Sequence, residues 1–126
     1  MPKLFLIAIG GSAGAVARYL LSGFAHRWTS GTFPVGTLFV NAVGCLAIGA
    51  VMGLIEDKGV LGPNVRWFIV IGFLGSFTTF SAFGFETIEM WSDGQLAAAG
   101  LNAVANFGLG LGAVLVGRVL VHSFVA

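Results

Sequence analysis

Fifteen residues near the middle of the chain combine small, hydroxyl and aromatic side chains within an otherwise apolar stretch. The segment GFLGSFTTFSAFGFE (residues 72–86) holds four hydroxyl side chains, three glycines and five phenylalanines. Gly, Ser and Thr are poor formers of continuous helix, and Ser and Thr side chains form hydrogen bonds with nearby backbone instead. We therefore predict that a helix through this segment is broken near its middle, around Thr78, and leaves backbone carbonyls and amides without helical partners.

Freed backbone groups and aromatic rings suit ions of either sign. Carbonyls hold a bare monovalent cation, whereas amides and the N-terminus of a half-helix favour an anion. Phe80 and Phe83 are three residues apart and share a helix face. Because the edge of a benzene ring is positively polarised, ring edges attract an anion more weakly than Lys or Arg does, as a conducting site requires. The alternative is that both rings only pack.

Three asparagines lie in other apolar segments. Asn41 lies within residues 36–55, and Asn102 and Asn106 lie one helical turn apart within residues 96–121. An unpaired amide in hydrocarbon costs on the order of 2–7 kcal/mol, so each side chain must face a partner or a water-filled pathway. The two N–H donors of an asparagine suit a small anion, and hydrogen bonding between helices is the alternative.

Charged side chains also enter the apolar segments. Arg18 interrupts residues 4–24, and Glu86 and Glu89 lie near the end of residues 65–91. A buried arginine either extends to the membrane interface or pairs with a carboxylate. We assign Arg18 and Glu86 to a structural or vestibule role rather than to direct selection of an ion.

The elements that must position these residues are four apolar segments. Each has close to the roughly 20 residues that span a bilayer, and they cover residues 4–24, 36–55, 65–91 and 96–121. Only 9% of the residues are charged, against about 25% in typical soluble chains. Lipid rather than water must therefore solvate the surface. The sequence predicts an all-α membrane protein with four transmembrane helices in a single domain, residues 1–126.

Several function classes are excluded by composition. A net charge of +1 without any cluster of Lys and Arg argues against a nucleic-acid surface. Cys45 is the one cysteine and the two histidines are far apart, so no zinc pattern forms. No nucleophile and base can be paired, and we therefore do not expect an enzyme.

Glycine spacing and charge placement bear on assembly and orientation. Three pairs of glycines four residues apart permit close approach of helices in lipid: Gly10 with Gly14, Gly49 with Gly53, and Gly108 with Gly112. A chain with so few helices needs a second copy to enclose a pathway. Four spans place both termini on one side, where Lys and Arg are only slightly more frequent. That weak bias is also typical of a protein that inserts in both orientations.

Four motifs together point to a known family. They are GSFTTFSAF at residues 75–83, GGSAG at residues 10–14 followed by Arg18, PVGTLFVN at residues 34–41, and Glu86 after the first motif. The combination resembles the Fluc (CrcB) family of fluoride channels, whose usual signature is GGxTTFSTF. The resemblance covers nearly the whole chain.

The resemblance implies an assembly and a cofactor. Members of the family are four-span proteins of the bacterial inner membrane that form antiparallel homodimers with dual topology. Each dimer has two fluoride pores, and both subunits line each pore. The resemblance also implies a structural Na⁺ at the dimer centre, held by the backbone oxygens of Gly75 and Thr78 from both subunits.

Pore residues follow from the same resemblance. Phe80 and Phe83 match the two pore phenylalanines of the family, and Asn41 matches its pore asparagine. Thr79 and Ser81 match hydroxyl residues around the break and the pore.

The chain departs from the family pattern at several positions. Ser76 replaces a glycine of the signature, and Ala82 stands where the family often has Thr. In the fourth segment, Asn106 is assigned to the pore in place of the Tyr or His and Ser of relatives. The register among Asn102, Asn106 and Gly110 stays open.

The resemblance implies a passive channel that exports fluoride and lowers its toxicity. The negative-inside membrane potential drives an anion outward by about 2.3 kcal/mol per charge per 100 mV. One alternative is a proton-coupled transporter of the small multidrug-resistance type, which needs a carboxylate deep in the membrane. The first segment carries Arg18 instead. The other alternative is a non-transporting scaffold subunit, which leaves Asn41 and the hydroxyl-rich segment without a purpose.

Overall fold

The fold consists of helices long and apolar enough to cross a membrane. The computed structural model describes residues 2–29 and 31–125, and within these ranges every regular element is helical. Four such helices span Pro2–Arg27, Val35–Asp57, Pro63–Ser92 and Leu96–Phe124. Their ends lie within three residues of the predicted segments, because each helix continues a short way past its apolar residues. The all-α fold with four spans is confirmed.

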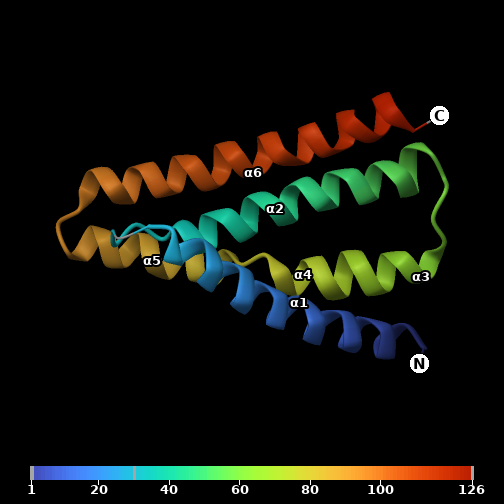
Figure 1. The fold of residues 1–126 in the computed structure, drawn as a ribbon, viewed down its shortest axis with the longest axis horizontal. Coiled ribbons are helices and arrows are strands. Elements are labelled where there is room, and N and C mark those ends of the chain that lie inside the picture. Colours follow the sequence, from blue (N-terminus) through green and yellow to red (C-terminus); the bar gives the residue numbers. More distant parts are fainter. Residues whose placement is uncertain (1, 30, 126) are drawn as a thin grey trace.

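The four spans form one bundle with both chain ends at the same side (Figure 1). Helix α1 (Pro2–Arg27) crosses the third span obliquely, and α2 (Val35–Met52) continues into the π-helical turn η1 (Gly53–Asp57). Helix α6 (Leu96–Phe124) runs beside α2 for most of its length. Most contacts between spans are therefore made by α2 with α6 and by α1 with the third span.

The third span differs from the others in its backbone. It consists of α3 (Pro63–Val65), the π-helical η2 (Arg66–Leu74), α4 (Gly75–Phe77) and α5 (Phe80–Ser92). Between α4 and α5 the backbone is extended, with φ and ψ of −86° and 155° at Thr78 and −146° and 117° at Thr79. These two residues are the threonines of the hydroxyl-rich segment.

Glycines allow two pairs of spans to approach closely. A Cβ atom at Gly10 or Gly14 of α1 would overlap a carbonyl oxygen of η2, and one at Gly49 of α2 would overlap the carbonyl oxygen of Val114. The backbones therefore touch where these residues lie, as the glycine spacing predicts.

The third glycine pair does not have this role within the protomer. A Cβ atom at Gly108 or Gly112 of α6 would have no heavy atom of another element within 4 Å. Within the protomer this pair therefore makes none of the close backbone contacts that Gly10 and Gly14 make, because both glycines face away from α2. The spacing identifies a helix face suited to close approach but does not identify the partner.

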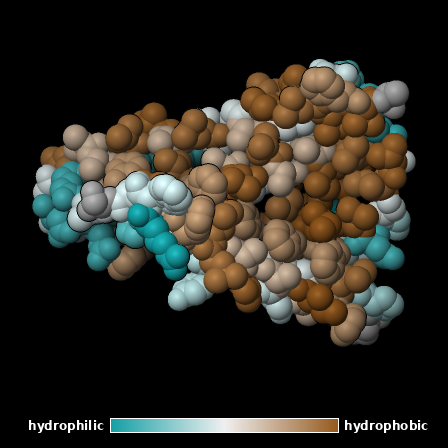
Figure 2. Space-filling view, in the orientation of Figure 1, coloured by the Kyte–Doolittle hydropathy of each residue, from teal (hydrophilic) through white to brown (hydrophobic). Residues whose placement is uncertain are grey.

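Hydrophobic side chains cover most of the outer surface. Figure 2 shows them over the middle of the molecule, with hydrophilic residues gathered at the left-hand end and along the right-hand edge. Trp28 and Trp91 are 77% and 63% exposed, and exposed tryptophans are typical of the membrane–water interface. At the end that carries the termini, the ammonium of Lys3 lies 5.5 Å from the ring centroid of Trp67.

Candidate ion pathway

Asn41 supplies the hydrogen bonds that the extended backbone of Thr79 lacks. Its Oδ1 accepts from the amide of Thr79 at 2.8 Å, and its Nδ2 donates to the carbonyl of the same residue at 3.1 Å. A buried backbone group without a partner is costly, so this side chain stabilises the non-helical conformation. The second span thereby fixes the point at which α4 ends.

Two backbone amides near this point donate to side chains instead of to carbonyls. In a continuous helix the amide of Thr79 donates to the carbonyl of Gly75, and that of Ala82 donates to the carbonyl of Thr78. Here the amide of Thr79 donates to Asn41, and the amide of Ala82 donates to the hydroxyl of Thr79 at 3.2 Å. The carbonyl oxygens of Gly75 and Thr78 are therefore relieved of their helical donors.

Three asparagines from two helices form a continuous hydrogen-bonded chain with Thr87. Asn41 Nδ2 donates to Asn106 Oδ1 at 3.0 Å, and Asn106 Nδ2 donates to the carbonyl and side-chain oxygens of Asn102 at 2.9 and 3.0 Å. Asn102 Nδ2 donates to Thr87 Oγ1 at 2.9 Å, and this hydroxyl donates to the carbonyl of Phe83 at 2.7 Å. We call Asn41, Asn106, Asn102 and Thr87 the asparagine ladder.

The asparagine ladder shows which hydrogen-bond partners each asparagine has. All three have protein partners, and Asn102 is only 1% exposed, so hydrogen bonding between helices applies to this residue. Both amide hydrogens of Asn41 already donate, one to Thr79 and one to Asn106. An anion beside Asn41 must therefore compete with these protein acceptors for the two N–H donors.

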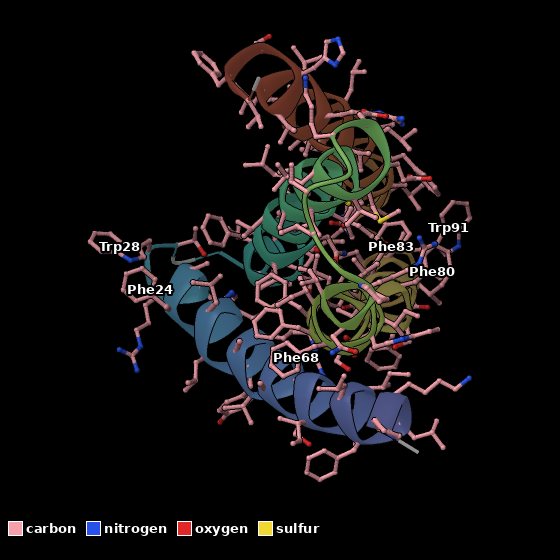
Figure 3. All side chains as sticks on the ribbon, turned by 90° about the vertical axis from the view of Figure 1, so that its right-hand side faces the viewer. Phe24, Trp28, Phe68, Phe80, Phe83 and Trp91 are labelled. Carbon is pink, nitrogen blue, oxygen red and sulfur yellow. The ribbon has the colours of Figure 1, made fainter. Side chains whose placement is uncertain are left out.

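Phenylalanine rings gather beside the extended residues. The ring centroids of Phe80 and Phe83 lie 5.4 Å apart, and Phe107 meets Phe83 edge-on at 5.9 Å. Phe83 is 7% exposed and Phe80 is 73% exposed, and Figure 3 shows the two rings together at one edge of the bundle. The shared helix face predicted for these residues therefore brings the rings together.

A small cavity of about 240 Å³ opens beside these rings. Its lining includes both Phe80 and Phe83, Thr78, Thr79, Asn41 and Asn106. Five of the six predicted pore residues thus line one cavity, with Ser81 as the exception. Ser81 is exposed, and its Oγ lies 3.3 Å from the hydroxyl of Thr79.

A second, wide cavity of about 930 Å³ lies where α1, the α1–α2 connection and α5 meet. Arg18 and Glu86 both line it, as a vestibule role requires. Arg18 Nε also donates to the carbonyl of Ser76 in α4 at 3.1 Å, so this arginine contributes to the structure near the extended residues. Glu86 Oε1 is buried and has no hydrogen-bond partner among the described residues.

Two residues that contact the candidate site were not identified from the sequence. Thr87 lies four residues after Phe83 and carries a hydroxyl that accepts from Asn102. Phe107 follows Asn106 and packs on Phe83. A polar side chain in an apolar segment is the signal that identified Asn102, and the hydroxyl of Thr87 gives the same signal. Phe107 gives no such signal, because it resembles any other apolar residue of α6.

Known proteins resemble this chain along nearly its full length. Residues 5–118 match the family model described as CrcB-like protein, Camphor Resistance (CrcB). The chain belongs to the CrcB-like family. The resemblance drawn from the sequence motifs is therefore correct, and the CrcB-like chain is a multi-pass bacterial membrane protein with four spans.

Individual CrcB-like relatives carry a more specific name. A protein of Maridesulfovibrio salexigens is 42% identical over 96% of this chain and 99% of its own length. One of Nitratidesulfovibrio vulgaris is 42% identical over 93% of this chain and 94% of its own length. One of Rhizobium etli is 38% identical over 99% of this chain and 100% of its own length. Each of the three is named fluoride-specific ion channel FluC.

Proposed function

We propose that this CrcB-like protein is a fluoride-selective passive ion channel of the bacterial inner membrane. It exports F⁻ from the cytoplasm and so lowers fluoride toxicity. The observation that carries the proposal is the small cavity, in which a pair of phenylalanine rings and several polar groups meet at membrane depth. The names of the full-length relatives supply the identity of the ion. A channel of this kind performs no covalent chemistry and is not an enzyme.

The break in the third span is the centre of the proposed pore. Non-helical backbone at membrane depth is tolerated where it is buried in protein or lines a cavity, and Thr78 and Thr79 line the small cavity. The ring edges of Phe80 and Phe83 attract an anion weakly, which permits both entry and release. The hydroxyls of Thr79 and Ser81 rotate freely enough to donate to a passing anion.

The amide groups of the pore act through the asparagine ladder. Asn41 and Asn106 line the small cavity, and their hydrogen bonds to each other and to Thr79 keep them oriented. Fluoride is a small and strong acceptor, so it competes for an amide hydrogen more effectively than chloride does. Arg18 and Glu86 belong to the vestibule.

An antiparallel homodimer with dual topology completes the two pores in this proposal. Phe80 is 73% exposed in the single protomer, so its ring is accessible to a second copy. Gly108 and Gly112 present an open helix face. A second copy that covers these surfaces would line each pore from both subunits, and the weak charge bias permits insertion in both orientations.

A structural Na⁺ at the centre of the dimer fits the donors that the chain offers. The carbonyl oxygens of Gly75 and Thr78 have lost their helical donors to Asn41 and Thr79. Backbone carbonyls are suitable ligands for a hard cation. The residues present therefore fit the ion, which would join the two subunits through these four-residue segments.

Efflux from reconstituted liposomes tests the function. Vesicles loaded with potassium fluoride or potassium chloride release the anion after a potassium ionophore is added, and an ion-selective electrode records it. The proposal expects fluoride release without a pH gradient and little chloride release. Glu86 has a buried oxygen without a hydrogen-bond partner in the part of the chain that the structure describes, and a buried carboxyl is the feature that a proton-coupled transporter would use. Cation exchange driven by a pH gradient, without fluoride release, would favour that alternative.

A further inference from the structure

The two ends of the asparagine ladder fix the direction of every hydrogen bond in it. At one end Thr87 donates to the carbonyl of Phe83, a group that only accepts. At the other end the amide of Thr79, a group that only donates, is bound by Asn41 Oδ1. The hydroxyl of Thr87 has one hydrogen, so it must accept from Asn102 Nδ2. Each amide of the ladder therefore has one allowed orientation.

Asn102 occupies the middle of this chain without touching the pathway. It is 1% exposed, and it lines neither the small cavity nor the wide one. Its Oδ1 and carbonyl accept from Asn106, while its Nδ2 donates to Thr87. The residue thus connects the part of the ladder that holds Thr79 to the part that holds Phe83.

We propose that Asn102 is a positioning residue for anion conduction, acting through Asn106 and Thr87 on the segment that carries the pore rings. Its effect reaches the backbone on both sides of Phe80, because the ladder ends at Thr79 and at Phe83. The inference rests on the proposed fluoride channel function. It adds a residue outside the pore lining that sets the geometry of the lining.

The chemistry of the position is demanding, because the side chain must accept from Asn106 and donate to Thr87 at the same time. Leucine has a similar volume and does neither. An ionised aspartate accepts but cannot donate, whereas a neutral aspartic acid does both with nearly the same shape. Burial raises the pKa of a carboxyl group, so the Asn102→Asp protein switches from a competent to an incompetent ladder as pH rises.

Fluoride efflux of three proteins tests the proposal, with the wild type measured in parallel at each pH. Asn102→Leu is expected to lower the rate roughly tenfold or more, because Asn106 loses its side-chain acceptor and Thr87 loses its donor, and only the backbone carbonyl of residue 102 still accepts from Asn106. The Asn102→Asp protein is expected to recover the rate at about pH 5.5 and to lose it toward about pH 9. Asn64→Asp, at an exposed position outside the ladder, is the matched control and is expected to follow the wild type at every pH.

Other titratable groups near α6 must be excluded as the cause of the pH dependence of fluoride efflux. The elements packed against α6 carry Cys45 on α2, Glu86 and Glu89 on α5, and Glu56 and Asp57 on η1. The wild type and the Asn64→Asp protein retain all five groups. Dividing the efflux rate of the Asn102→Asp protein by their rates at the same pH therefore removes any contribution that these groups make alone. Liposomes without protein correct for leakage of hydrogen fluoride at low pH.

The outcomes separate the inference from the proposed function. If the wild type releases no fluoride, the channel function itself fails. If the wild type conducts and Asn102→Leu forms a dimer with the wild-type rate, Asn102 does not position the pore. Equal rates of Asn102→Asp and Asn102→Leu at every pH would also overturn the inference. Recovery by Asn102→Asp supports it whether the rate falls with pH or stays high, since a carboxyl that stays neutral keeps the ladder intact.

Discussion

Replacing either of the two phenylalanines proposed for the pore with isoleucine separates conduction from packing. Phe80 and Phe83 line the same cavity, yet their surroundings differ, since Phe80 is 73% exposed in the protomer and Phe83 is 7% exposed. Isoleucine keeps an apolar side chain but has no polarised ring edge. We therefore expect Phe80→Ile and Phe83→Ile to lose fluoride efflux alike and to differ in stability.

The magnitude of the stability difference follows from the aromatic contacts. Phe83 packs against Phe80 at 5.4 Å and against Phe107 at 5.9 Å, and each aromatic pair contributes about 0.5–1.5 kcal/mol beyond its buried area. Phe83→Ile loses both pairs and is expected to cost about 1–3 kcal/mol. Phe80→Ile loses one pair and is expected to cost about half of that.

Two measurements on each protein check this prediction. Efflux of fluoride from liposomes gives the conduction, and the midpoint of thermal unfolding in detergent, followed by size-exclusion chromatography, gives the relative stability. Phe124→Ile, at an 82% exposed position near the end of α6, is the control and should change neither. Wild-type efflux in both Phe80→Ile and Phe83→Ile would refute the assignment of these rings to the pore.

Three further predictions concern the backbone that would support the proposed pore. Asn41→Leu leaves the backbone amide and carbonyl of Thr79 unpaired and should lower the free energy of unfolding by about 2–6 kcal/mol, from about 1–3 kcal/mol for each of these two groups. An unchanged unfolding midpoint would contradict the role of Asn41 as their hydrogen-bond partner. Gly49→Ala places a Cβ against the carbonyl of Val114 and should lower the unfolding midpoint. A Cβ at Gly100 has open space, so Gly100→Ala should lower the midpoint less. Equal effects of the two substitutions would argue against close packing of α2 on α6. Prolonged dialysis against a sodium-free buffer should abolish efflux or dissociate the dimer, and a fully active dimer after dialysis would exclude a structural Na⁺.

Much of the fold follows from composition, because lipid imposes a simple constraint. A segment must be apolar and about 20 residues long to span a bilayer, and the sequence meets this condition four times. The apolar segments therefore predict the spans closely, although the helices extend past them at several ends.

Contacts between the spans are less predictable. Asn41 and Thr79 are 38 residues apart, and their pairing depends on the rotation and register of two helices that no local pattern encodes. The same limit explains Gly108 and Gly112, whose spacing indicates close approach but not its partner. The sequence predicts that Asn41 must find partners, and only the packed bundle shows that both of its N–H groups already have them.

In the proposed channel, the asparagine ladder would stabilise the pore without charged side chains. A Lys or an Arg in the small cavity would hold an anion too tightly for release, and a carboxylate would repel it. Asparagine supplies donors and acceptors without net charge, so it forms hydrogen bonds with the backbone of Thr79 that the helix leaves unpaired. The electrostatic potential in the small cavity then arises from weak dipoles and from the edges of the aromatic rings. On this view Arg18 is compatible with conduction because it lies in the wide cavity, outside the lining of the small one. Moving a positive charge inward, as in Asn106→Lys, should therefore slow fluoride release by trapping the ion rather than speed its entry.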